Sequence, residues 1–196
     1  MRASLSHHQL RLIRLFLSAA LLFTAVATAA AQAYPSKIRG YKVYNADVRV
    51  RSADPASKGS GNDAELRLTP LRVIDIGITG ITVAAGGTIY GNEHSGKIHF
   101  LTFENFRING IPVEIDEYTT QFSFSKGAAV DLPVPAHIFI NTISLAKAVK
   151  SELFDRKDRW HIDGTVFVFG KFKRFGIGFK RVVPVRIDIE IDNPLR

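Results

Sequence analysis

The sequence predicts an all-β protein: an antiparallel β-sandwich of the immunoglobulin or fibronectin III type with about seven to eight strands. Asn109-Gly110 stands between two apolar runs and predicts a two-residue hairpin turn, because both positions must adopt positive φ. Residues 183–192 alternate between apolar and charged side chains, as expected of a half-buried strand. Turn signals separate many other short apolar runs, which is typical of sandwich folds.

Short extended runs bounded by Gly, Pro and polar residues predict the other strands of the N-terminal and central chain. One of them, residues 74–83, changes its apolar face at Gly80, which indicates a bulge or a bend. Residues 52–65 are rich in Gly, Ser and Asp and predict a polar loop. The remaining extended runs lie at residues 41–44, 48–50, 66–68, 88–90, 97–103, 106–108, 111–115, 121–125 and 129–132.

The C-terminal third contains two strong strand patterns. Residues 160–169 are apolar at both parities, which predicts a central strand covered on both faces. Pro184 cannot donate a ladder hydrogen bond, so we expect this part of residues 183–192 at a sheet edge or a strand start. Between the central strands and residues 160–169, Asn141 is a plausible helix N-cap. Good helix formers with an apolar stripe predict a short accessory helix at about 142–154.

The N-terminus predicts a secretory signal peptide at residues 1–33. Three arginines and no acid precede the apolar run Leu15 to Val26, and Ala31-Gln32-Ala33 offers a small-x-small cleavage pattern before Tyr34. The alternative is an uncleaved anchor, although the run is short for a span of about 20 residues. We expect an exported, periplasmic or secreted protein, with short strands and a loop at 34–65 and the sandwich at 66–196.

The composition narrows the chemistry. The chain of 196 residues has no cysteine, which excludes disulfides, thiol nucleophiles and zinc thiolate sites. The formal net charge of +8 includes the three arginines of the first 33 residues, so the remainder carries +5. This mildly basic balance does not by itself indicate nucleic acid, which usually needs a clustered basic face.

Four motifs in a fixed order resemble the late embryogenesis abundant type 2 family, also called the water stress and hypersensitive response domain, in a bacterial exported form. They are Phe106 to Val113 around the Asn-Gly turn, Val130 to Pro135, His161 to Val166 with its central glycine, and Val183 to Ile187. The resemblance implies a sandwich of seven to eight strands with some helix, no catalysis and no cofactor. It also implies a role in stress protection or membrane-associated binding.

No catalytic or metal motif is evident, so we expect no catalytic residue, no metal and no small-molecule substrate. There is no Gly-x-Ser-x-Gly elbow and no phosphate-binding glycine loop. His161 and Asp163 share a strand face, but a metal site needs more converging ligands. Paired carboxylates at Glu114/Asp116 and Asp188/Glu190 leave open an exported, hydrolase-like enzyme. We favour solvated strand faces for both pairs.

The segment from Gly170 to Arg181 combines five cations with three phenylalanines between two strong strands. Such a mixture suits anionic lipid surfaces, which attract basic residues while aromatic side chains reach the acyl boundary. Single-stranded nucleic acid is a chemical alternative, but an exported protein rarely meets it. The rival interpretation is a hairpin whose cations are solvated or pair with acidic residues 188–192. The candidate ligand-binding residues are Lys171, Lys173, Arg174, Lys180 and Arg181, and the expected partners are anionic lipid surfaces or envelope proteins.

Overall fold

The computed structural model describes residues 34–52, 63–141, 158–174 and 176–194. The chain divides into two compact units, Met1–Pro35 and Ser36–Arg196, and every strand described below belongs to the second. The predicted helix at about 142–154 and the predicted signal peptide at 1–33 lie outside the described residues. Within the described part of the chain, no helix is long and apolar enough to cross a membrane.

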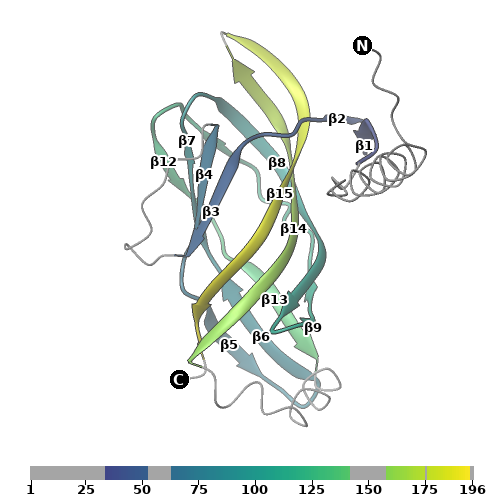
Figure 1. Cartoon of the computed structure of the whole chain (residues 1–196), viewed down its shortest axis with the longest axis vertical. Helices are drawn as coiled ribbons and strands as arrows, with labels where there is room; N and C mark the ends of the chain where they lie inside the picture. The colour runs from purple at the N-terminus through teal and green to yellow at the C-terminus, as the bar shows by residue number, and fades with distance from the viewer. Residues whose placement is uncertain (1–33, 53–62, 142–157, 175, 195–196) are drawn as a thin grey trace, which may run out of the picture. The chain divides into compact units, whose positions relative to one another are not determined.

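The described residues form an all-β fold of three sheets (Figure 1). The largest sheet has the order β1-β2-β15-β14-β8-β11, with β9 paired to β8. Its strands are β1 (Lys37–Ile38), β2 (Tyr41–Val43), β15 (Ile177–Asp192), β14 (Arg159–Arg174), β8 (Ser95–Ile108), β11 (Phe122–Phe124) and β9 (Ile111–Pro112). The second sheet contains, in order, β10 (Glu114–Ile115), β13 (Ala136–Asn141), β6 (Gly80–Ala85) and β5 (Arg72–Ile76). The third contains β12 (Ala129–Asp131), β7 (Gly87–Gly91), β4 (Ala64–Leu68) and β3 (Val48–Ser52).

The all-β prediction is therefore confirmed, but two of its details change. The described residues contain fifteen strands, not seven or eight. Strands β1, β9 and β10 have only two residues each. A strand this short is too short to show a period-2 pattern in the sequence. The sheets are also mixed and not purely antiparallel, because β3 pairs in parallel with β4 and β2 with β15. A period-2 pattern carries no information about strand direction, so the sequence could not reveal this.

The Asn109-Gly110 turn forms as predicted. Ile108 pairs with Ile111 across it, and Asn109 and Gly110 have φ values of 50° and 80°. The Asn109 side chain also accepts a hydrogen bond from the His161 backbone N–H at 2.9 Å, which fastens the turn to β14. The turn is thus held both by its own backbone geometry and by the neighbouring strand.

Replacing Gly110 with valine is expected to lower the free energy of unfolding by about 1–3 kcal/mol, because a β-branched residue resists positive φ. Urea unfolding measures the effect. Gly77→Val is the matched control, since Gly77 needs no positive φ and a Cβ there would meet nothing closer than 3.7 Å. Equal stability of the two variants would contradict the strained-turn account.

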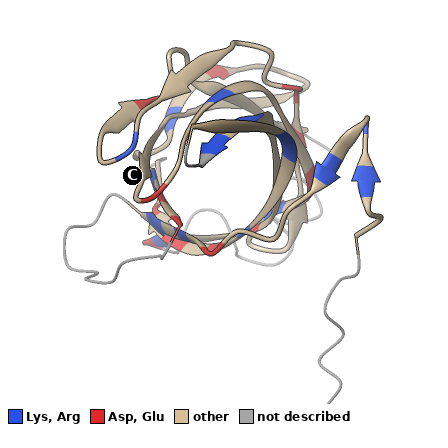
Figure 2. Cartoon of the chain, turned by 90° about the horizontal axis from the view of Figure 1, so that it is seen from above, with Lys and Arg blue, Asp and Glu red and all other residues tan. Residues whose placement is uncertain are grey.

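The three sheets share one apolar interior, around which the strands are arranged when seen from above (Figure 2). Trp160 and Ile108 from the large sheet and Val83 and Ile140 from the second sheet are fully buried. Leu66 and Ile89 from the third sheet are partly buried and pack against the same cluster. The interior face of β15 follows its predicted pattern, with Ile187 and Ile191 buried, Ile189 partly buried, and Asp188 and Glu190 exposed.

One predicted apolar stripe lies outside this core. Ile74, Ile76 and Ile78 alternate with other residues as a half-buried strand would, yet they are 51%, 68% and 96% exposed. β5 is the last strand of its sheet, and a register shift between Val73 and Asp75 interrupts its pairing with β6. The face that the alternation marked as internal therefore points away from the described core.

Candidate functional site

The basic and aromatic segment Gly170–Arg181 forms the closed end of the long β14–β15 hairpin. The two strands pair without interruption from Arg159↔Asp192 to Arg174↔Ile177, and Gly176 has the positive φ of 79° that a tight turn requires. In Figure 1 this end of the hairpin extends past the neighbouring strands. The segment is therefore a projecting hairpin.

Three lysines lie side by side across the base of this projection. Lys171 is paired with Lys180 of β15 on one side and with Lys97 of β8 on the other. Cross-strand partners point to the same face of a sheet, and like charges placed directly opposite each other destabilise it. All three residues are exposed. We call Lys97, Lys171 and Lys180 the lysine row.

His99 lies close enough to the lysine row for the three charges to affect its pKa. Burial, followed by the charges of Lys97, Lys180 and Lys171, lowers the pKa of His99 below its ordinary value of 6.5. Its Nδ1 lies 2.8 Å from the hydroxyl of Tyr41 on β2. The neutral ring can accept this hydrogen bond at Nδ1, which fits a site where positive potential disfavours the imidazolium.

Changing Lys171 and Lys180 to glutamine is expected to raise the pKa of His99, because two of the charges that lower it are removed. NMR titration of the His99 ring measures this directly. Since the folded pKa lies below the unfolded one, His99 stabilises the fold at high pH, and this contribution is lost as pH falls from about 6.5 through the folded pKa. Arg107→Gln, at the other end of β8, is the control. An unchanged His99 pKa in the double variant would contradict the account.

The opposite face of the hairpin end is apolar. Phe172 is paired with Phe179 and packs against the core, whereas Phe179 and Ile177 are 41% and 60% exposed. The Arg181 guanidinium carbon lies 5.1 Å from the centre of the Phe179 ring, a cation–π distance. The projecting end thus carries the lysine row on one face and, on the other, exposed apolar side chains with Arg181 among them.

The structure brings together part of the predicted site. Lys171 and Lys180 are paired, Lys173 is exposed two residues further along β14, and Arg181 lies on the face of Phe179. Arg174 belongs to β14, but its side chain lies outside the described residues. Lys97 and His99 were missed, because they come from β8, more than 70 positions earlier, and only strand pairing places them beside the hairpin.

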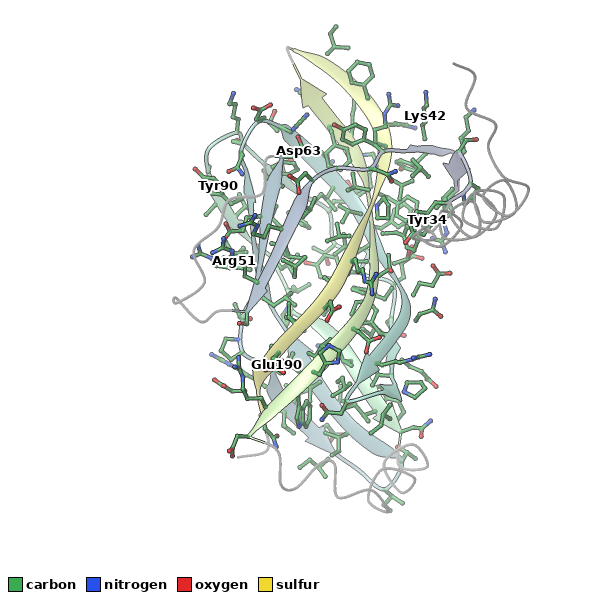
Figure 3. The ribbon with its side chains drawn as sticks, in the orientation of Figure 1. Tyr34, Lys42, Arg51, Asp63, Tyr90 and Glu190 are labelled. Atoms are coloured by element: carbon green, nitrogen blue, oxygen red, sulfur yellow. The ribbon has the colours of Figure 1, made fainter. Side chains whose placement is uncertain are left out.

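The acidic residues of β15 do not pair with these cations, so of the rival interpretation only the arm with solvated cations remains, which the exposed Lys171, Lys173 and Lys180 fit. Asp188 lies 2.9 Å from the His161 ring, and this hydrogen bond lowers the pKa of Asp188. Glu190 lies 3.6 Å from Arg159. Figure 3 shows Glu190 near one end of β15 and Lys42, whose partner is Arg181, near the other. In the described part of the chain, no acidic group forms an ion pair with Lys171, Lys173, Lys180 or Arg181.

The candidate catalytic carboxylates lie on exposed strand faces. Glu114, Asp116, Asp188 and Glu190 are all exposed. His161 and Asp163 approach to 4.0 Å, but no group of three or more potential metal ligands occurs among the residues that the structure describes.

Comparison with known proteins assigns no family. No family model and no curated protein matches the chain. A crystal structure of a protein from Archaeoglobus fulgidus is similar over 64% of this chain and 94% of its own, with 9% identity and a TM-score of 0.39. A solution structure of a protein described as late embryogenesis abundant is similar over 67% of this chain and 73% of its own, with 10% identity and a TM-score of 0.29. Similarities at this level carry no argument about function.

Proposed function

We propose that this chain is a non-enzymatic exported protein that binds anionic membrane surfaces through the projecting end of the β14–β15 hairpin. The observation that carries the proposal is the lysine row. Three like charges in direct cross-strand register oppose folding, and no acidic side chain of the described residues pairs with Lys171 or Lys180. An anionic surface would compensate these charges from outside.

The energetics of surface binding support this reading. A cation close to an anionic leaflet contributes about 1 kcal/mol, so the lysine row alone supplies about 3 kcal/mol. Ile177 and Phe179, exposed at the tip, add apolar surface that enters the headgroup boundary. The charge contribution weakens with salt, since exposed charges are screened over about 10 Å at 0.1 M ionic strength.

The other functions considered have less support. An exported hydrolase would gather its carboxylates around a deep pocket, whereas Glu114, Asp116, Asp188 and Glu190 are exposed. A role in stress protection like that of late embryogenesis abundant type 2 proteins rests on the order of the four sequence motifs, and it is compatible with membrane binding. An envelope protein as partner would have to present an acidic surface to the same lysine row.

Vesicle co-sedimentation tests the proposal. The protein is mixed with phosphatidylglycerol vesicles and with phosphatidylcholine vesicles, at low and at high salt. We expect sedimentation with the anionic vesicles at low salt, less at high salt, and little with the neutral vesicles. The absence of any preference for anionic vesicles would sink the proposal.

Export is the second part of the proposal and is tested separately. The order of positive, apolar and small residues in 1–33 supports cleavage near Ala33 and Tyr34. Export then brings the hairpin to the outer leaflet of the inner membrane, to the outer membrane or to another cell surface. N-terminal sequencing of the exported protein should begin near Tyr34, and an intact Met1 end confined to the cytoplasmic fraction would contradict it.

A further inference from the structure

We infer that the interior of the sheet unit takes up the acyl chain of an anionic amphiphile, whose head group is held at the mouth by Lys173 and Arg181. The inference goes beyond the proposed function, because it concerns the space between the sheets and not the lysine row. It rests on three adjoining hollows and on the kind of side chain that lines each of them.

Two apolar cavities lie inside the unit. The first has a volume of about 90 Å³ and lies among residues of β3, β4, β7, β8, β11, β14 and β15. The second also has about 90 Å³ and reaches Ile162, Ile187 and Ile191 at the other end of the core. Leu66, Ile89 and Val168 line both cavities, so the two adjoin each other.

The mouth of the first cavity differs from its interior because cationic side chains line it. A third hollow of about 180 Å³ shares Tyr44, His94 and Phe172 with the first cavity and adds Lys173, Phe179 and Arg181 from the hairpin. The lining therefore gains cations toward the outside, where Lys173 and Arg181 join the aromatic residues that the hollow shares with the first cavity. This gradient matches an amphiphile with an apolar tail and an anionic head.

The two carboxylates near the first cavity are engaged by other groups. Asp63 accepts a hydrogen bond from the Asp47 backbone N–H at 2.9 Å and lies 3.8 Å from the His94 ring. Figure 3 places Asp63 toward the hairpin end of the unit. Glu65 accepts a hydrogen bond from Arg67 at 2.9 Å. The cations that line the outer hollow, and that an anionic head can therefore reach, are Lys173 and Arg181.

The dimensions suit an acyl chain. The two cavities and the outer hollow, of about 90, 90 and 180 Å³, share lining residues and together have about 360 Å³. This is roughly twice the volume of a cavity that holds the six-carbon ligand benzene, so an amphiphile of about twelve carbons fits only with its head and the start of its chain in the outer hollow. An apolar cavity of about 150 Å³ is known to stay dry and to take up benzene, so cavities with these walls favour hydrocarbon over water.

Calorimetric titration and native mass spectrometry with matched probes test the inference. The probes are laurate, dodecyl phosphate and dodecanol, each below its micelle-forming concentration. We expect one laurate or one dodecyl phosphate per chain, and affinity for dodecanol about tenfold lower because it cannot pair with the cations. Preference for laurate indicates a free fatty acid, and preference for dodecyl phosphate indicates a phospholipid. Equal affinity for dodecanol overturns the role of the mouth, and no binding of any probe overturns the inference.

Variants inside the cavity separate this inference from membrane binding. Val168→Phe fills the junction of the two cavities and is expected to lower laurate affinity by about tenfold or more, with an unchanged or raised Tm because it fills a void. Val134→Phe is the control, since Val134 is 45% exposed and lines neither cavity. If Val168→Phe does not fold, Ala64→Leu in the first cavity replaces it.

Two readouts keep the outcomes distinct. Val168→Phe should leave vesicle sedimentation unchanged, because the lysine row is untouched. Lys173→Gln combined with Arg181→Gln should lower the affinity for laurate and leave that for dodecanol unchanged. Unchanged laurate affinity in the cavity-filling variants would overturn the inference even if vesicle binding persists. If the original protein binds laurate but does not sediment with anionic vesicles, the result would count against the proposed function alone.

Discussion

Changing Lys97, Lys171 and Lys180 together to glutamine is expected to lower the affinity for anionic vesicles by roughly 100-fold. Each cation near the surface contributes about 1 kcal/mol, and about 1.4 kcal/mol corresponds to a tenfold change in affinity. The same triple variant should be as stable as the original protein, or slightly more stable, because the repulsion across the strands is removed. Vesicle co-sedimentation gives the affinity, and urea unfolding gives the stability.

The matched control changes Arg72, Arg107 and Arg186 to glutamine. These residues are exposed and lie away from the hairpin end, on β5, at the far end of β8 and near the middle of β15. The control has the same net charge as the lysine variant, so it isolates position from total charge. An equal loss of vesicle affinity in both triple variants would mean that net charge, and not the lysine row, attracts the protein to the surface.

Replacing Trp160 with alanine is expected to lower the free energy of unfolding by about 3–5 kcal/mol, the usual cost of removing a large buried aromatic side chain. Trp160 is fully buried in β14 and is paired in register with Ile191. Since the described unit has no disulfide or metal cluster, its core must supply the stability. Urea unfolding followed by circular dichroism measures the effect without relying on the lost fluorophore.

Tyr90→Ala is the control for this prediction. Tyr90 is a large aromatic residue of β7 that is 40% exposed, and it lies at the outside of the unit in Figure 3. Its removal should cost much less, because it leaves no sealed cavity. Similar losses for the two variants would show that Trp160 is not a central element of the core.

Features that depend on neighbouring residues alone, such as turns and the buried face of a strand, could be predicted from the sequence. Asn109-Gly110 formed its turn because both residues tolerate positive φ whatever surrounds them. The alternation of residues 183–192 marked the interior face of β15 because one of its faces is solvated. The hydrophobic residues on both faces of β14 predicted its central place between β15 and β8.

The rule that proline lies at a sheet edge or a strand start did not decide where Pro184 lies in its strand. It lies inside β15, opposite Phe167, and not at the start of the strand. On its other side β15 pairs only with β2, at Arg181 and Val182. At Pro184 only one side of β15 is paired, so the edge prediction agrees with its place in the middle of a long strand.

Features that depend on distant pairing could not be predicted. The lysine row needs Lys97 of β8 beside Lys171 of β14, and the sequence does not state which strands are neighbours. The chemistry of Lys171 and Lys180 was visible in the sequence, whereas the third lysine and the titrating His99 were not. The apolar cavities also escaped prediction, because the same aliphatic residues would line a filled core.

The most direct test of the account asks whether the hairpin tip enters a membrane surface. Ile177→Trp places an indole at the exposed tip, and the only native tryptophan, Trp160, is fully buried and gives a constant background. We expect the emission of the introduced indole to shift to the blue on adding phosphatidylglycerol vesicles at low salt, and to return at high salt. Phosphatidylcholine vesicles should leave it unchanged. Emission that stays unchanged while the protein sediments with anionic vesicles would contradict the claim that this hairpin makes the contact.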